Sequence, residues 1–257
     1  MKSGGWKVAG ASVRGSSHEK LGLPCQDAHQ WGILPNGTII AAVADGAGSA
    51  PLAEAGATLA CKEVVSRISE RLKSLSGADG LKDDGWKELL TESVAATRAA
   101  IELEAQTRSA PLADFATTLL VAAAGKGFVA SIQIGDGAIV VAESEDRVNC
   151  VGRPGQSEYV NETSFLTSAT ALAEASPVIW RGQLAHLALL SDGLQMAALR
   201  MPEAEPHPGF FAPLFRFVRS QDNGVSASAG LADFLNSPRL RERTDDDVTL
   251  VLATLRD

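Results

Sequence analysis

Hydrophobic residues in this chain form short runs, and several of these runs meet an acidic residue at one end. Four such junctions occur: Thr38–Ala44 before Asp45, Phe128–Ile134 before Gly135-Asp136, Leu184–Leu190 before Ser191-Asp192, and Asp245-Asp246-Asp247 before Val248–Leu255. A carboxylate at the end of a buried strand lies at the rim of a sheet, where a metal ion or a substrate can reach it. We therefore expect these acids to meet in space.

Most of the runs are short and follow one another closely, a pattern typical of antiparallel strands. Asn36-Gly37 between two apolar runs predicts a hairpin turn, and we expect the strands from Phe115 to Val151 to form a meander. The predicted strands are Trp6–Val13, Ala28–Leu34, Thr38–Ala44, Phe115–Ala124, Phe128–Ile134, Ala138–Ala142, Arg147–Val151, Ile179–Leu190 and Val248–Leu255.

Helical periodicity marks two long segments, Pro51–Leu75 and Trp86–Arg108. In both, apolar residues recur at spacings of three and four and form one stripe, which is typical of a helix packed on a sheet. Shorter helices are predicted at Leu194–Leu199, Phe210–Ser220 and Ser226–Leu235. Predicted surface loops, marked by polar residues, glycine or proline, are Arg14–Pro24, Gly152–Pro177 and Met201–Gly209.

The order of these elements indicates the fold class. Strands occur in antiparallel groups instead of alternating singly with helices, which favours an α+β fold over a doubly wound parallel sheet. About eight to ten strands are more readily packed as two sheets than as one, so we predict a four-layer sandwich of two antiparallel sheets flanked by helices. No repeat, low-complexity tract or linker divides the sequence, and we predict one domain over residues 1–257.

The composition is that of a soluble globular protein, with 45% hydrophobic and 21% charged residues. The net charge of −8 argues against nucleic acid as a partner, because neutralising phosphates requires Lys and Arg, and it suits an acidic pocket filled by divalent cations. Cys25, Cys61 and Cys150 are far apart and lack CxxC spacing, which favours a reducing, cytoplasmic location. We find no apolar signal core and no run of about 18 apolar residues, so no membrane partner is expected.

An Asp-Gly pair also has a simpler meaning, because it is a preferred hairpin turn. That alternative is strongest for Asp136-Gly137, which has predicted strands on both sides.

Carboxylates that converge cannot all remain ionised without cations. Mg²⁺ and Mn²⁺ favour oxygen ligands, and a pair of such ions can clamp a phosphoryl group, which makes hydrolysis of a phosphate ester the natural chemistry. The sequence contains no Walker-type loop, HExxH or GxSxG motif that would support a common alternative.

Several segments, taken in chain order, resemble the motifs of one known family. They are Pro24-Cys25-Gln26-Asp27-Ala28, Val43-Ala44-Asp45-Gly46-Ala47-Gly48-Ser49, Ala116-Thr117-Thr118-Leu119-Leu120, Gly135-Asp136-Gly137, Leu190-Ser191-Asp192-Gly193 and Asp246-Asp247-Val248-Thr249. The family is that of the metal-dependent Ser/Thr protein phosphatases, type 2C, and the resemblance runs from about Gly10 to Leu255. The stretch Glu158–Thr167 resembles a bacterial branch of the family, which favours a bacterial origin.

The resemblance implies a fold, a ligand set and a reaction. The family's fold is a sandwich of two antiparallel sheets flanked by helices, in agreement with the pattern above. The implied Mn²⁺ or Mg²⁺ ligands are Asp45 bridging two ions, the Gly46 carbonyl on one of them, Asp192 and Asp246 on the other, Asp27 acting through water, and Asp136 at a third, weaker ion. With Asp45 and Asp27 as catalytic residues, water attacks phosphoserine or phosphothreonine on proteins without a phosphoenzyme. A phosphorylated protein and a cognate Ser/Thr kinase are the implied partners.

Several family positions are changed in this chain, and two of them bear on substrate binding and proton transfer. Many relatives place a His after the Asp-Gly, suited to protonating the leaving group, and this chain has Ala47. Many also place an Arg before the early Asp to hold the substrate phosphate, and this chain has Gly22 there. His18 and Lys20 are nearby candidates for the phosphate contact, although a loop histidine is by default an exposed residue without a role.

These departures leave alternatives open. One is a regulatory or binding protein that retains the fold and the metal site but has little turnover, and another is a hydrolase of small phosphate esters. Two further expectations are structural. Either Asp245 or Asp247 is expected to orient the segment around Asp246, and His186, within an apolar strand, is expected to be a satisfied core or edge residue.

Overall fold

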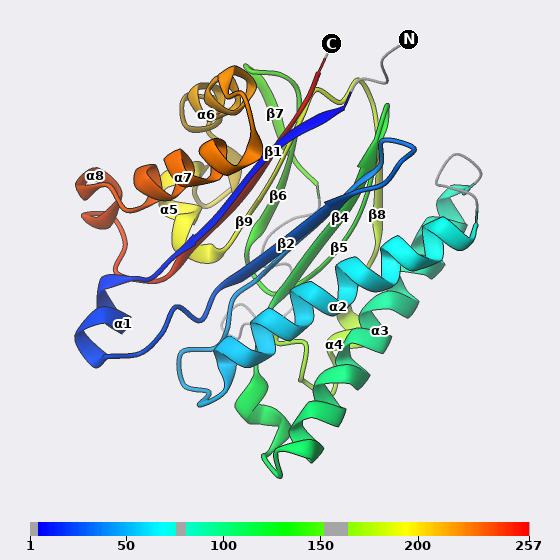
Figure 1. Ribbon diagram of the computed structural model, residues 1–257, viewed down its shortest axis with the longest axis vertical. Coiled ribbons are helices and arrows are strands. Elements are labelled where there is room, and N and C mark those ends of the chain that lie inside the picture. Colours follow the sequence, from blue (N-terminus) through cyan, green and yellow to red (C-terminus); the bar gives the residue numbers. More distant parts are fainter. Residues whose placement is uncertain (1–4, 76–80, 152–163, 257) are drawn as a thin grey trace.

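Two antiparallel sheets stack face to face in the computed structural model of the chain, which describes residues 5–75, 81–151 and 164–256 (Figure 1). The first sheet consists, from edge to edge, of β1 (Trp6–Val13), β12 (Val248–Leu255), β9 (His186–Leu190), β6 (Ala138–Ser144) and β7 (Arg147–Cys150). The second sheet consists, in the same way, of β2 (Ala28–Ile33), β3 (Ile39–Ala44), β4 (Leu119–Gly125), β5 (Phe128–Ile134) and β8 (Val178–Arg181). The predicted α+β sandwich is confirmed.

Helices cover the outer face of each sheet, which completes the four predicted layers. α2 (Ala53–Ser74) and α3 (Asp83–Thr107) pack on the second sheet, and α6 (Pro208–Ser220) and α7 (Gly224–Leu235) pack on the first. The shorter elements are α1 (Ser16–Leu21), α4 (Ala171–Glu174), α5 (Gln195–Ala198), α8 (Pro238–Arg241), the 3₁₀ turns Leu112–Phe115 and Asp192–Leu194, and a ribbon of β10 (Leu199–Arg200) and β11 (Glu205–Pro206). None of the helices in the described ranges has the length and apolar content that a membrane span requires.

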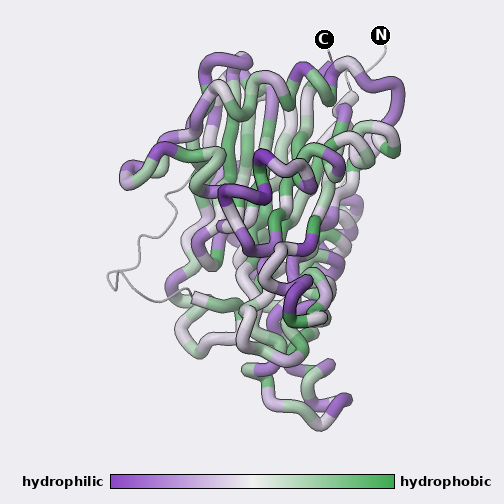
Figure 2. The backbone as a smooth tube through the Cα atoms, turned by 90° about the vertical axis from the view of Figure 1, so that its left-hand side faces the viewer, coloured by the Kyte–Doolittle hydropathy of each residue, from purple (hydrophilic) through white to green (hydrophobic). Residues whose placement is uncertain are grey.

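Strand β3 shows why the apolar runs are continuous instead of alternating. Every residue of β3 is buried, because both faces of its sheet are covered. Ile39, Ala41 and Val43 belong to the core between the two sheets. The alternate residues Ile40 and Ala42 belong to the core under α2 and α3. The hydrophobic strands therefore fill the interior of the molecule, as Figure 2 shows.

The structure corrects the predicted strand connections in two places. Residues Ile179–Leu190 form two strands in place of one, and β8 and β9 belong to different sheets. The chain turns between them at Gly182, whose amide donates to the Gly127 carbonyl at 3.2 Å. β5 and β6 also belong to different sheets. Asp136-Gly137 is therefore a crossing between sheets, and the predicted hairpin and continuous meander are wrong, since an apolar run alone does not reveal which sheet a strand joins.

Three predicted segments differ in type or extent. Arg14–Pro24 was expected to be a loop but contains α1, a polar six-residue helix without the apolar stripe that predicts helices. The first four positions of the predicted strand Phe115–Ala124 precede β4, and Phe115 ends a 3₁₀ turn. Part of Gly152–Pro177 lies outside the described residues. Its described part buries Leu166 and Ala171 in the core under α3, so it is not a surface loop there.

Gly56 allows α2 to approach the 3₁₀ turn Leu112–Phe115. A methyl group at this position would overlap the backbone carbonyl of Phe115, and Phe115 is fully buried. Gly85 in α3 offers a contrast, because a methyl group there would meet only the flexible side chain of Leu81.

We therefore expect Gly56→Ala to lower the free energy of unfolding by about 1–3 kcal/mol, as overpacking does. The matched change Gly85→Ala should be neutral or stabilising by up to about 1 kcal/mol, because alanine favours a helix more than glycine does. Urea denaturation measures both values, and equal effects of the two variants would contradict the close approach at Gly56.

His186 in β9 is a satisfied core residue, as expected. Its Nδ1 lies 3.1 Å from the Thr254 hydroxyl, and Arg219 donates to Nε2 at 3.2 Å. The ring stacks on Phe215 with centroids 4.3 Å apart. Burial, and to a smaller extent the charge of Arg219, lowers the pKa of His186 to about 4.

The pKa of His186 is lower in the folded protein than its value of about 6.5 in the unfolded chain. Its contribution to stability is therefore fully present above pH 6.5 and is lost as the pH falls toward 4. In His186→Gln this pH-dependent part is absent. The stability difference between the wild-type protein and His186→Gln should therefore shrink from pH 7 toward pH 4.5 in thermal unfolding. A difference that stays constant with pH would show that His186 is not neutral in the folded state.

Candidate metal centre

The strand registers bring the predicted acids to one end of the sandwich. Ala28 pairs with Ala44, so Asp27 before β2 lies beside Asp45 after β3. Leu190 pairs with Leu250, so Asp192 after β9 lies beside the acidic segment 245–247 that leads into β12. These two pairs of chain ends lie close to each other, since the carboxyl groups of Asp27, Asp192 and Asp246 all act on Asp45. Of the strand-end acids expected to converge, Asp45, Asp192 and Asp246 do so, and Asp27 joins them.

The backbone of Asp45 is fixed by two threonines that precede β4. Its amide donates to Thr118 Oγ1 at 2.9 Å, and its carbonyl accepts from the Thr118 amide at 2.8 Å and from Thr117 Oγ1 at 3.0 Å. Gly46 continues this contact by bridging to Thr117. A side chain at Gly46 would overlap Ala53 of α2, so the backbone after β3 can follow this path only with glycine.

Asp27 is held by hydroxyl groups from the opposite sheet. Ser191 Oγ donates to Asp27 Oδ2 at 2.7 Å and accepts from the Thr249 amide at 2.9 Å. The Thr249 hydroxyl also lowers the pKa of Asp27, less than Ser191 does, and both act against burial, which is the largest effect and raises it. The hydroxyl groups thus stabilise a carboxylate that burial alone would neutralise.

Burial and mutual repulsion dominate the electrostatics of the acids. Burial raises the pKa of Asp45, and the neighbouring Asp27 and Asp192 carboxyl groups raise it further. Burial also raises the pKa of Asp246, with additional repulsion from Asp192 and Asp247. Without a cation, this cluster binds protons to relieve its repulsion.

Among residues 5–75, 81–151 and 164–256, three acceptor oxygens at this end of the molecule lack a donor. They are Gln26 Oε1, Asp27 Oδ1 and Asp192 Oδ1, each buried. Buried acceptors without a donor are costly, and a divalent cation with a preference for oxygen ligands satisfies them. Within the described residues, no three His, Cys, Asp or Glu side chains form a group arranged to hold a metal ion. Backbone carbonyls and water would therefore have to complete the coordination of a cation, as is usual for Mg²⁺.

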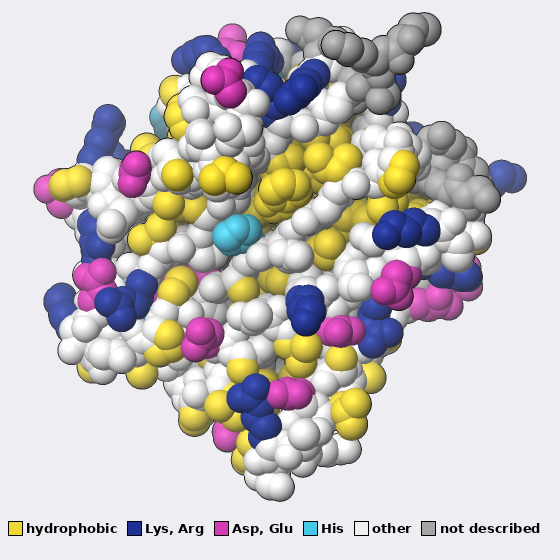
Figure 3. All heavy atoms as spheres, in the orientation of Figure 1, with side chains coloured by type: hydrophobic (Ala, Val, Ile, Leu, Met, Phe, Trp, Pro, Cys, Tyr) yellow, Lys and Arg dark blue, Asp and Glu magenta, His cyan; other side chains and the backbone are white. Residues whose placement is uncertain are grey.

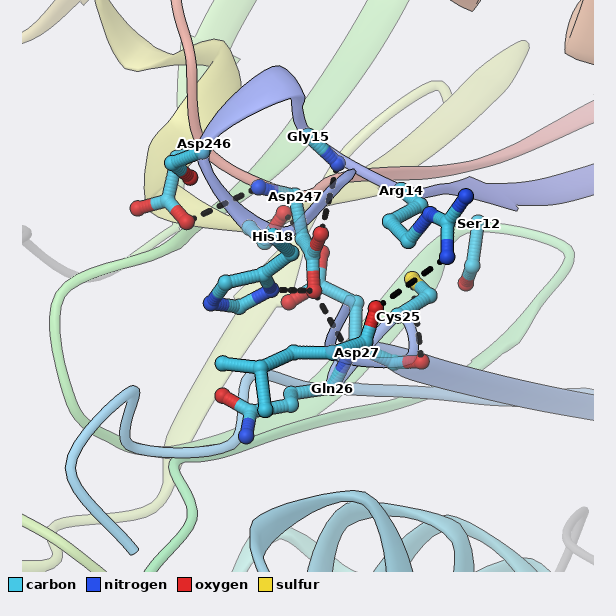
Figure 4. A network of polar contacts seen from close by, with 12 residues as sticks. Ser12, Arg14, Gly15, His18, Cys25, Gln26, Asp27, Asp246 and Asp247 are labelled. Atoms are coloured by element: carbon cyan, nitrogen blue, oxygen red, sulfur yellow. Dashed lines mark hydrogen bonds and ion pairs between the residues drawn. The ribbon is translucent and has the colours of Figure 1, made fainter. Parts of the chain in front are cut away.

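Asp247 has a structural role, as expected for one neighbour of Asp246. Its carboxylate accepts from the amides of Gly15 at 2.6 Å and Gln26 at 2.5 Å, and it lies 2.9 Å from His18 Nδ1 (Figure 4). It therefore ties α1 and the segment before β2 to the start of β12. His18 is buried, so the default of an exposed loop histidine is wrong.

Asp136 and Lys20 are the remaining predicted site residues. The backbone carbonyl of Asp136 accepts from the side-chain amide of Gln195, which directly follows the 3₁₀ turn that begins at Asp192. Lys20 has an exposed side chain on α1.

Comparison with known proteins decides the family. The protein phosphatase 2C family matches residues 14–236, and Asp246 lies beyond the matched stretch. The chain is 34% identical over 261 residues to Serine/threonine-protein phosphatase 3 of Escherichia coli (strain K12), with 96% of this chain and 98% of that protein covered. The chain belongs to the protein phosphatase 2C family.

Solved structures of protein phosphatases share its fold. The serine/threonine phosphatase PstP/Ppp of Mycobacterium tuberculosis aligns with a TM-score of 0.65 at 17% identity, covering 98% of this chain and 99% of that chain. The serine/threonine phosphatase Stp1 of Staphylococcus aureus aligns with a TM-score of 0.64 at 13% identity, covering 98% and 95%. At these identities the likeness shows the fold alone, and it agrees with the predicted sandwich.

The structure gives physical reasons for both changed family positions. Ala47 packs in a small apolar cluster with Ala50, Ala53 and Ala116, so no polar side chain extends from this point of the loop. Gly22 ends α1 with a φ of +70°, a left-handed conformation that favours glycine over arginine. Gly22, which the motif comparison assigns to the position of that arginine, thus ends a helix in this chain.

Four supporting hydroxyl residues were not predicted as part of the site: Thr117, Thr118, Ser191 and Thr249. The first two lie in the small-residue segment before β4, Ser191 directly precedes Asp192, and Thr249 lies in the motif that begins at Asp246. The presence of hydroxyl residues in these motifs was visible in the sequence. The acid that each hydroxyl contacts, however, depends on the register between strands that are distant in sequence.

Mn²⁺ should stabilise this protein phosphatase 2C domain against thermal unfolding, because a ligand at about 100 times its Kd adds about 2.7 kcal/mol. The shift in Tm should shrink strongly in Asp45→Asn and Asp192→Asn. Asp233→Asn, which changes an exposed carboxylate on α7, is the matched control and should retain the full shift. Equal shifts in all three variants would mean that Mn²⁺ binds elsewhere.

Proposed function

We propose that the protein is a metal-dependent protein phosphatase that hydrolyses phosphoserine and phosphothreonine on other proteins. The observation that carries this proposal is the set of buried, unsatisfied carboxylate oxygens of Asp27 and Asp192 beside Asp45, in a member of the protein phosphatase 2C family. The related phosphatase of Escherichia coli aligns over almost its whole length, which supports the same activity class.

The proposed ligands are those that the motifs imply. Two Mn²⁺ or Mg²⁺ ions would be held by Asp45 and the Gly46 carbonyl, by Asp192 and Asp246, and by Asp27 through water, with a third ion at Asp136. When bound, such ions lower the pKa of water and offset the charge of the phosphoryl group. Water then attacks phosphorus directly, and no phosphoenzyme forms.

The chain's own groups position the reacting partners. Thr117 and Thr118 fix the backbone of Asp45, and Ser191 fixes one oxygen of Asp27. The other oxygen of Asp27 has no donor within the part of the chain that the structure describes. This arrangement holds the carboxylates before a substrate arrives, which reduces reorganisation during the reaction. His18 and Lys20 remain the proposed contacts of the substrate phosphate.

The proposed partners are a phosphorylated protein and a cognate Ser/Thr kinase, and the proposed location is the cytoplasm. Nucleic acid is not a proposed partner. The net charge is −8, and on the face shown in Figure 3 Lys and Arg alternate with Asp and Glu instead of forming a continuous basic band. That face therefore offers no continuous row of basic side chains to neutralise the phosphates of a nucleic acid.

A second candidate function rests on Ala47 and Gly22. These residues remove the proton donor and the phosphate-binding arginine of many relatives, which suits a regulatory protein that keeps the metal site with little turnover. The hydroxyl residues around Asp27 and Asp45 would serve a metal site in either case. We favour the enzyme because the related phosphatase of Escherichia coli aligns over almost its whole length.

Hydrolysis of a phosphothreonine peptide tests the enzyme against the regulatory protein. The wild-type protein should release phosphate with Mn²⁺ and stop with EDTA. Asp45→Asn and Asp192→Asn should lower kcat/KM by at least about 100-fold, because a bound metal ion supplies several kcal/mol. Mn²⁺ binding without turnover would overturn the proposed activity and favour the regulatory protein.

A further inference from the structure

His18 and Asp247 form a buried pair beside the acidic cluster. Nδ1 of His18 lies 2.9 Å from Asp247 Oδ2, and the two side chains are 10% and 2% exposed. Asp247 is fixed in turn by the backbone amides of Gly15 and Gln26. A carboxylate that accepts backbone amides cannot donate, so Nδ1 of His18 carries the hydrogen of this contact. The pair therefore sets both the ring orientation and the tautomer of His18.

Helix α1, which carries His18, is attached directly to the segment that contains the predicted ligand Asp246. The amide and the hydroxyl of Ser17 both donate to the Asp245 carbonyl, at 2.9 Å and 2.6 Å. Glu19 forms an ion pair with Arg241 of α8. These contacts fix the distance between the imidazole and the acidic segment, so His18 does not need a loop closure to reach the site.

The free nitrogen of His18 faces the loop that follows Asp45. Nε2 lies 3.9 Å from the position that a Cβ atom at Gly48 would occupy. In Figure 4 this side of the ring points away from Asp247, toward the side on which Asp246 lies. Among the residues that the structure describes, no hydrogen-bond partner of Nε2 is found. An imidazole with one nitrogen fixed and the other free is arranged to transfer a proton.

Other side chains near this loop are less suited to the task. Ala47 has no polar group, and Lys20 projects from the exposed face of α1. Burial raises the pKa of the Cys25 thiol, and the carboxylates of Asp27 and Asp247 raise it further, which keeps the thiol protonated. His29 has its Nδ1 engaged by Ser12 at 2.8 Å.

We propose that His18, positioned by Asp247, donates the proton to the departing serine or threonine oxygen of the substrate. This inference rests on the proposed phosphatase function. In the step, the bond between phosphorus and the side-chain oxygen breaks, and that oxygen keeps the electron pair and takes the proton from Nε2. The attacking water forms the new bond to phosphorus and releases a proton to solvent, from which His18 is protonated again. His18 thus fills the role that Ala47 leaves open.

Two substrates with different leaving groups test this role. A threonine oxygen needs a proton to depart, whereas p-nitrophenolate departs without one. His18→Gln keeps a hydrogen-bond donor but cannot transfer a proton. We expect kcat for a phosphothreonine peptide to fall by about 100-fold or more, as loss of a general acid does. The kcat for p-nitrophenyl phosphate should fall far less, because the glutamine amide keeps the phosphate contact proposed for His18. His207→Gln, at the start of α6, is the matched control and should leave both rates unchanged.

Metal binding and chemical rescue separate proton donation from structural damage. The Mn²⁺-induced shift in Tm of His18→Gln should equal that of the wild-type protein. In His18→Ala, added imidazole should restore hydrolysis of the peptide. Equal loss of both substrates in His18→Gln, or no loss of either, would overturn the role of His18 while leaving the phosphatase function intact. A wild-type protein that hydrolyses neither substrate would overturn the proposed function itself.

Discussion

Repulsion among buried carboxylates is the constraint on which this end of the molecule depends. Asp27 and Asp45 lie side by side because their strands pair, and Asp192 comes from the other sheet. The repulsion is offset by hydroxyl donors at Asp27, while the packed cores on both sides of each sheet prevent the acids from moving apart. The rigid packing thus maintains electrostatic repulsion among the acids, and a cation at this position would relieve that repulsion.

The layers of the fold were predictable because burial on both faces leaves a clear trace in the sequence. β3 is apolar throughout and β9 is apolar after His186, and the stripe on α2 shows which side of that helix is covered. The assignment of strands to sheets was not predictable in the same way. A run such as Ile179–Leu190 is equally apolar whether it forms one strand or two, and the turn at Gly182 is decided by contacts with another part of the chain. That the chain forms one domain remains a prediction.

The candidate site was predictable where its chemistry lies in single residues at strand ends, as for Asp45 and Asp192. It was not predictable where the role comes from tertiary contacts. α1 has no apolar periodicity, and it is held by Asp245 and Asp247 from the far end of the chain. His18 therefore looked like a surface residue in the sequence, although the structure places it in a buried pair.

The position of β12 in the first sheet has a consequence for synthesis of the protein. β12 follows every other strand in the chain, yet it lies between β1 and β9 and brings Asp246 and Asp247 to the site. During translation, β1 has no neighbour in its sheet until β12 leaves the ribosome. A nascent chain can thus assemble the second sheet with α2 and α3 early, but it gains a complete acidic cluster only when its last strand is inserted. Unfinished or carboxyl-terminally clipped chains consequently lack the complete acidic cluster.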